Sequence, residues 1–197
     1  MEIKNPKEVL QKSLEDSCGL TAYLKTLEVF NVDVSTNKKY QKNFTAYYRV
    51  RRDANWLKKY YEFMEAHKHD SNLSFETIIR YLSSIPHKVN KKVSPSGYAT
   101  TIEPSFASKM LATINPNYPI WDSQVVRALK YKIEAVEDEA KLEEYIDVYS
   151  KLTNEIRSFI KTEEGKECIR LFDELFPNHK HLNSFKKIDF YLWNIGK

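Results

Sequence analysis

The sequence is poor in glycine. Its 197 residues include four glycines, and these are scattered along the chain: Gly19, Gly97, Gly165 and Gly196. Phosphate-binding loops of the Walker A and dinucleotide types need two or three glycines within a few residues. We therefore expect no nucleotide cofactor of these classes.

Cysteine is equally scarce. Cys18 and Cys168 each stand alone, and two cysteines cannot supply the four ligands of a four-cysteine iron–sulfur cluster. Two pairs of histidines have a spacing of two, which places their rings on opposite sides of a helix: His67 with His69, and His179 with His181. We predict two buried thiols, with a long-range disulfide as the alternative, and neither a metal ion nor another cofactor.

Long apolar runs are absent as well. No run reaches the roughly 18 residues that a membrane span requires. The first six residues, MEIKNP, contain no apolar stretch of the signal-peptide type. Hydrophobic residues make up 42% of the chain and charged residues 29%, a balance typical of folded globular proteins. We expect a cytoplasmic protein without a membrane partner.

Apolar residues recur at helical spacing along nearly the whole chain, and no strand-like alternation of useful length is present. A polar stretch from Ser35 to Asn43 separates the first helical segments from one whose apolar face contains Trp56, Leu57, Tyr60, Tyr61 and Met64. Further helices are predicted from Ser74 to just before Pro86, from Pro104 to about Ile114, from Asp122 onward, and over residues 142–160, 169–176 and 188–193.

This pattern predicts an all-α fold, with residues 1–197 forming one multi-helix globular domain. Two helical lobes that meet near residues 87–122 are the alternative organisation. Residues 87 to 103 contain four cationic or histidine side chains with Pro95 and Gly97, and we predict a long basic loop there.

Charge is distributed unevenly along the chain, whose formal net charge is +4. From Lys38 to Lys92 there are 13 Lys and Arg against 5 Asp and Glu, whereas from Lys132 to Asp147 there are 2 against 7. A basic region beside an acidic one is typical of proteins in which one face meets the phosphates of a nucleic acid. The alternative is a solvated surface with uneven charge.

One basic stretch combines arginine and lysine with aromatic residues, as phosphate contacts and base stacking require. Its cationic candidates for nucleic-acid binding are Arg49, Arg51, Arg52, Lys58 and Lys59. Lys88, Lys91 and Lys92 would extend this surface if the two regions meet. Alternatively, the stripe of Trp56, Tyr60 and Tyr61 faces the core and the charges are merely solvated.

Two consecutive segments, residues 103–111 and 119–127, contain Pro104, Lys109 and Asp122 in an order that resembles the helix-hairpin-helix DNA glycosylase superfamily. The resemblance covers roughly Pro95 to Tyr131 and is greatest to uncharacterised bacterial proteins similar to 8-oxoguanine glycosylases. Ser105 and Ala107 stand where the family has glycines whose amides approach a DNA phosphate.

The resemblance implies a helix-hairpin-helix fold, double-stranded DNA as the partner, and excision of a damaged base in DNA repair. Asp122 would stabilise the charge that develops on the sugar or orient the attacking water. Lys109 would attack the sugar carbon and form a Schiff base. An aromatic side chain would hold the flipped base or fill the gap that it leaves, and the candidates are Trp121, Tyr118 and Phe106.

Each of these residues also has a structural explanation. Asp122 is a good helix N-cap, Lys109 a solvated lysine, and Trp121 and Phe106 core residues. Two further functions therefore stay open. One is a non-catalytic module of the same fold that binds nucleic acid or protein. The other is an interaction protein that uses the acidic surface from Glu134 to Asp147.

Overall fold

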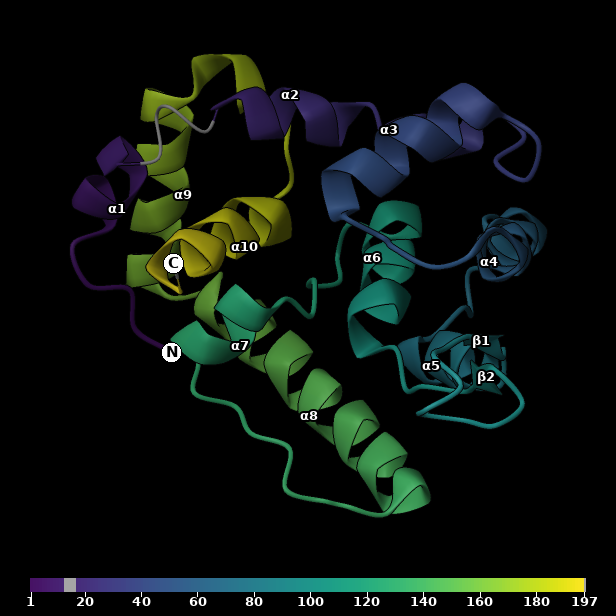
Figure 1. Ribbon diagram of the computed structural model, residues 1–197. Coiled ribbons are helices and arrows are strands. Elements are labelled where there is room, and N and C mark those ends of the chain that lie inside the picture. The colour runs from purple at the N-terminus through teal and green to yellow at the C-terminus, as the bar shows by residue number, and fades with distance from the viewer. Residues whose placement is uncertain (13–16, 197) are drawn as a thin grey trace. The chain divides into compact units, whose positions relative to one another are not determined.

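The computed structural model describes residues 1–12 and 17–196, without the side chains of residues 17–19, and it is mostly helical (Figure 1). The predicted all-α fold is confirmed. The chain divides into two compact units, which we describe separately. Unit 1 consists of Met1–Thr21 and Asn115–Lys197, and unit 2 of Ala22–Ile114.

Unit 2 contains four of the α-helices in the part of the chain that the structure describes. They are α3 (Lys38–Tyr48), α4 (Ala54–His67), α5 (Phe75–Ser83) and α6 (Pro104–Ile114), preceded by the 3₁₀ helix η2 (Leu27–Phe30). Side chains at the N-caps satisfy free amides at the starts of three of these helices: Asn37, Asp53 and Ser74. The core between them is rich in aromatic rings, and Phe44 alone contacts Tyr48, Tyr60 and Tyr61.

The apolar face of α4 lies in this core, as the helical spacing predicts. Trp56 and Tyr60 are 0% exposed and Tyr61 is 1% exposed. α5 and α6 pack against each other with Ile78, Ile79, Met110 and Leu111 buried. The aromatic stripe of α4 is therefore a structural feature.

Two elements of unit 2 differ from the prediction. α3 lies across the polar stretch that showed no helical pattern, because Tyr40, Phe44 and Tyr48 form a buried row at a spacing of four. The predicted loop over residues 87–103 contains a short antiparallel hairpin of β1 (His87–Lys88) and β2 (Tyr98–Ala99).

Unit 1 contains α1 (Pro6–Lys12), α7 (Ser123–Ala128), α8 (Asp138–Phe159), α9 (Glu163–Leu175), the 3₁₀ helix η3 (Pro177–His179) and α10 (Ser184–Ile195). α2 (Ser17–Leu24) crosses the boundary between the units. α10 packs against α1, α7 and α9, with Ile188, Tyr191 and Leu192 buried. A Cβ at Gly165 would overlap the carbonyl group of Phe159, so α9 starts directly against the end of α8.

Candidate nucleic-acid interface

Asp53 joins the two basic segments of unit 2. Its Oδ1 accepts hydrogen bonds from the backbone N–H groups of Asn55 and Trp56, both at 3.1 Å, and so caps α4. Its Oδ2 accepts from the backbone N–H of Lys88 at 2.9 Å. The bond from Lys88 is the largest of the causes that hold the pKa of Asp53 below its usual value. The hairpin is thereby attached to the start of α4, directly after Arg51 and Arg52.

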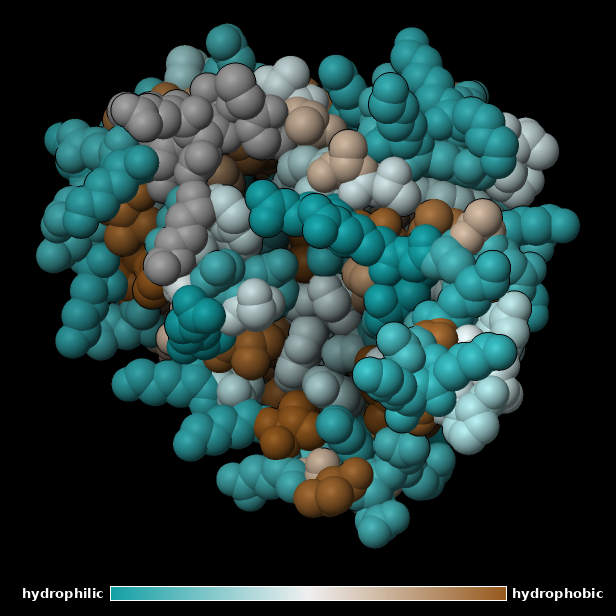
Figure 2. Space-filling model, viewed as in Figure 1, coloured by the Kyte–Doolittle hydropathy of each residue, from teal (hydrophilic) through white to brown (hydrophobic). Residues whose placement is uncertain are grey.

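The cations around this junction face solvent. We define the basic surface as five exposed side chains: Arg49, Arg51, Lys88, Lys91 and Lys92. None of them forms an ion pair with any residue in the described ranges, whereas the exposed Lys58 lies 3.7 Å from Glu62. Lys59 is half-buried on α4. In Figure 2 the region that contains β1 and β2 in Figure 1 is covered mainly by hydrophilic and near-neutral residues.

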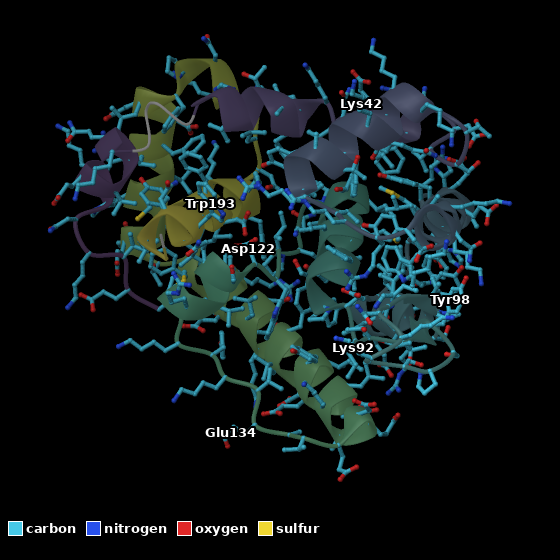
Figure 3. The ribbon with its side chains drawn as sticks, in the orientation of Figure 1. Lys42, Lys92, Tyr98, Asp122, Glu134 and Trp193 are labelled. Atoms are coloured by element: carbon cyan, nitrogen blue, oxygen red, sulfur yellow. The ribbon has the colours of Figure 1, made fainter. Side chains whose placement is uncertain are left out.

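The charge asymmetry follows the division into units. Unit 2 has 15 Lys and Arg against 8 Asp and Glu, a formal charge of +7. Unit 1 has 16 against 19, a formal charge of −3. The acidic run from Lys132 to Asp147 lies entirely in unit 1, on the segment before α8 and on its first half (Glu134 is labelled in Figure 3).

Arg52 faces inward and has a partner of its own. Its Nε donates to Oε1 of the buried Glu103 at 2.9 Å, and its Nη2 contacts the same oxygen. Its guanidinium lies 5.1 Å from the ring centroid of Phe106. This charge therefore stabilises unit 2, and Arg52 contributes less to the surface than its neighbours.

Lys109 is buried, with 8% of its surface exposed, and is not the solvated lysine of the structural explanation. It lies on α6 with its Nζ 5.6 Å from the ring centroid of Phe106. Burial raises the pKa of the nearby Glu103, and the positive charges of Arg52 and Lys109 act in the opposite direction. Burial among charged groups is the environment that changes the reactivity of a lysine.

Asp122 lies in unit 1, at the start of α7 (Figure 3). Its Oδ1 accepts from the backbone N–H of Gln124 at 2.9 Å, so it is the N-cap of that helix. No hydrogen bond from the described residues reaches its Oδ2. Lys109 belongs to unit 2. The two predicted catalytic groups therefore lie in different units, and the surroundings of each are described within its own unit.

The predicted base-binding aromatic residues are at least half-buried. Trp121 is 7% exposed, and its ring lies 5.4 Å from that of Tyr145 in a T-shaped arrangement. Tyr118 and Phe106 are half-buried, and the Phe106 ring lies 5.6 Å from that of Trp56. This packing favours the core explanation for Trp121 and Phe106 over a wedge exposed to DNA.

The two positions that correspond to the family's hairpin glycines lie inside α6. Ser105 is in the first turn, where the backbone N–H has no intrahelical acceptor. Ala107 is 0% exposed, and its N–H donates to the carbonyl oxygen of Glu103 at 2.9 Å. The amide of Ala107 is therefore already used by the helix and does not reach a phosphate in this conformation.

The cysteine and histidine predictions have separate outcomes. Cys168 is a buried free thiol, and burial raises its pKa to about 12, whereas the side chain of Cys18 lies outside the described residues. His67 ends α4 and its Nδ1 lies 2.9 Å from the carbonyl oxygen of Phe63. Within the described ranges, no group of three or more His, Cys, Asp or Glu is arranged to hold a metal ion.

Asp53 and Glu103, which organise this region, and the exposed Tyr98 of the hairpin were not singled out from the sequence. Asp53 precedes an apolar helical stripe, so the N-cap pattern that identified Asp122 would have found it. The run Ser94-Pro95-Ser96-Gly97 is a turn signal that predicts a hairpin ending at Tyr98. No comparable signal exists for the pairing of Glu103 with Arg52.

Comparisons of the chain with protein-family models, with curated proteins and with solved structures found no match. Among the described helices, none combines the length and the apolar character needed to cross a membrane.

Proposed function

We propose that this chain binds double-stranded DNA through the basic surface of unit 2. The observation that carries the proposal is that Asp53 accepts hydrogen bonds at both carboxylate oxygens. One oxygen caps α4, and the other binds the backbone of the hairpin. Through this bond Lys88, Lys91 and Lys92 extend the surface that begins with Arg49 and Arg51. Exposed cations on one surface that form no ion pair with described residues are suited to bind the phosphates of a duplex.

The acidic character of unit 1 supports the same assignment. A formal charge of −3 repels phosphates, so unit 2, whose charge is +7, is expected to supply most of the phosphate contacts. The proposal thus predicts that removal of the same number of exposed cations weakens DNA binding in unit 2 and has little effect on it in unit 1.

Fluorescence anisotropy with a labelled duplex over a series of salt concentrations tests this proposal. We expect the logarithm of the association constant to fall linearly with the logarithm of the salt concentration. Lys88→Ala, Lys91→Ala and Lys92→Ala combined should decrease the slope by about 0.9 for each phosphate contact that is removed.

A matched control comes from three exposed lysines of unit 1 that form no ion pair with described residues: Lys132, Lys161 and Lys180. Their combined replacement by alanine removes the same charge and should leave the slope nearly unchanged. Equal losses in the two triple variants would mean that only net charge matters. Absence of duplex binding at low salt would overturn the proposal.

A second candidate function, excision of a base from DNA, follows from the role predicted for Asp122 in unit 1 or, alternatively, from that predicted for Lys109 in unit 2. No described residue donates a hydrogen bond to Oδ2 of Asp122, so this oxygen can stabilise a sugar cation or orient a water molecule. The base leaves with the electrons of the N-glycosidic bond, and water or the amine of Lys109 forms the new bond to the sugar carbon.

Duplexes that each contain one damaged base, treated with alkali after incubation, report excision as strand cleavage. Asp122→Asn keeps a capping oxygen and should abolish cleavage without changing the melting temperature. Borohydride should trap a covalent adduct with the wild-type chain and none with Lys109→Met. An Asp122→Asn variant with full cleavage would exclude this chemistry, and DNA binding without any cleavage would leave the non-catalytic module.

A further inference from the structure

The hairpin has two unlike faces. Lys88 lies directly opposite Tyr98 in the antiparallel pair, and His87 lies opposite Ala99. Side chains of directly opposed residues share one face of a two-stranded ribbon. Lys88 and Tyr98 are exposed, whereas His87 and Ala99 are half-buried, so the face with the lysine and the tyrosine is the outer one.

Tyr98 presents its ring to solvent (labelled in Figure 3). It is 47% exposed, and no other ring within the described ranges packs on it. Exposed large apolar or aromatic side chains are few in the described residues, and the same hairpin also carries Val93, which is 72% exposed. An uncovered ring beside a lysine, on a surface of unpaired cations, has the composition of a base-stacking site.

Hydrogen bonds of the hairpin fix the backbone that carries this ring before any ligand binds. The backbone N–H of Val89 donates to the carbonyl oxygen of Gly97 at 2.9 Å, next to the Lys88–Tyr98 pair. The turn itself is closed by hydrogen bonds from Val93 to Asn90 at 2.8 Å and from Gly97 to Ser94 at 2.9 Å. Gly97 has φ +75°, a value that other residues rarely adopt. Because these bonds fix the backbone, binding costs less conformational entropy.

We propose that Tyr98 is a stacking platform for an unpaired base, and that Lys88 contacts a phosphate beside that base. The inference rests on the proposed DNA binding and deepens it by naming the class of substrate. Inside an intact duplex both faces of every base are covered by its neighbours. An aromatic ring can stack only on a base that is single-stranded, bulged or turned out of the helix.

Three fluorescent probes of one sequence test the inference: a fully paired duplex, the same duplex with one bulged 2-aminopurine, and the single strand with 2-aminopurine. We expect Tyr98→Ala to weaken binding to the bulged duplex and the single strand by about 5- to 150-fold, the range observed for loss of one stacked base. The affinity for the paired duplex should change by less than about twofold. The 2-aminopurine fluorescence, which stacking quenches, should decrease on binding to the wild-type chain and not on binding to Tyr98→Ala.

Three variants separate stacking from charge and from general apolar contact. Tyr98→Phe retains the ring and should retain the preference for the bulged duplex. Lys88→Ala should decrease the salt slope, whereas Tyr98→Ala should leave it unchanged because it removes no charge. Phe30→Ala is the matched control, because Phe30 lies in the same unit and is 46% exposed, and we expect no change in any affinity.

The outcomes distinguish this inference from the proposed function. Salt-dependent binding of all three probes with equal affinity, unaffected by Tyr98→Ala, would overturn the stacking platform and leave DNA binding intact. Absence of binding to every probe would overturn both. A similar loss in Phe30→Ala and Tyr98→Ala would also overturn the platform, because it would trace the effect to apolar surface in general.

Discussion

One helix of unit 1 and the basic surface of unit 2 use their cationic side chains in opposite ways. On α10 of unit 1, Lys186 and Lys187 are 9% and 5% exposed, and their Nζ atoms lie 2.9 Å from Asp189 and 2.6 Å from Asp173. In unit 2 the five cations of the basic surface are exposed, and none forms an ion pair with a residue that the structure describes. The Lys187–Asp173 pair joins α10 to α9, and the Lys186–Asp189 pair lies within α10. These charges serve the fold, whereas the second arrangement leaves positive charge available to a ligand. The local packing of the cations, rather than their number, thus separates the two roles.

The largest expected effect tests the structural role in unit 1. Asp189→Ala removes the carboxylate from a buried ion pair, and such a loss costs about 3–5 kcal/mol. We expect the free energy of unfolding of unit 1 to fall by about that amount, measured by urea unfolding followed by circular dichroism. Asp189→Asn, which keeps the shape, should lose less.

The contrasting variant combines Lys88→Ala, Lys91→Ala and Lys92→Ala in unit 2. Substitutions of exposed side chains without partners change stability by about 0.5 kcal/mol or less. A loss below about 1 kcal/mol for Asp189→Ala, or a loss of several kcal/mol for the triple variant, would remove the distinction between the paired lysines of α10 and the basic surface.

The second prediction compares two capping aspartates. Asp122→Ala removes one cap, which costs about 1 kcal/mol. Asp53→Ala removes a cap and the bond to the hairpin, so we expect a larger loss, about 1–2 kcal/mol, together with weaker DNA binding. Asp122→Ala should leave DNA binding unchanged. Both quantities follow from urea unfolding and anisotropy.

Asp53→Asn refines this comparison, because an asparagine has one oxygen and can accept at only one of the two places. If it caps α4, the hairpin is released. We then expect nearly wild-type stability with the weaker DNA binding of Asp53→Ala. Full DNA affinity in both Asp53 variants would show that the hairpin is positioned without this bond.

Helices were predictable from local sequence, and their assembly into a surface was not. The starts of α5, α6 and α7 follow from Ser74, Pro104 and Asp122, which act within one turn. α3 was missed because its first half is polar, with Gln41, Lys42 and Asn43 between Tyr40 and Phe44. The two basic segments are joined by a hydrogen bond that Asp53 accepts from a backbone N–H 35 residues away. Because every residue except proline has a backbone N–H, the identity of Lys88 does not indicate that it bonds to Asp53.

The third prediction concerns pH and the buried carboxylate of unit 2. Burial raises the pKa of Glu103, so the folded state binds this proton more tightly than the unfolded state. The bound proton stabilises the folded state at low pH. This stabilisation is lost as the pH rises from the usual pKa of glutamate through the raised pKa of Glu103. Each pKa unit of elevation corresponds to about 1.4 kcal/mol.

Glu103→Gln should remove this dependence, so that unfolding curves over a pH series become flatter on the basic side of the usual glutamate range. Asp53 has the opposite sign, because its pKa is lowered and its contribution is lost as the pH falls. An unchanged pH profile in Glu103→Gln would show that Arg52 and Lys109 offset the cost of burial completely.

The last prediction has the smallest expected effect on stability, and it tests the effect of a charge on DNA binding without a change in the fold. Arg49 in unit 2 and Lys130 in unit 1 are both exposed and have positive φ angles, 53° and 58°. Glycine adopts this conformation without steric cost but loses more entropy on folding, so we expect Arg49→Gly and Lys130→Gly to change stability by about 0.5 kcal/mol or less. Arg49→Gly should nevertheless decrease the salt slope of DNA binding by about 0.9, and Lys130→Gly should not. Equal salt slopes of DNA binding in Arg49→Gly and Lys130→Gly would place Arg49 outside the interface.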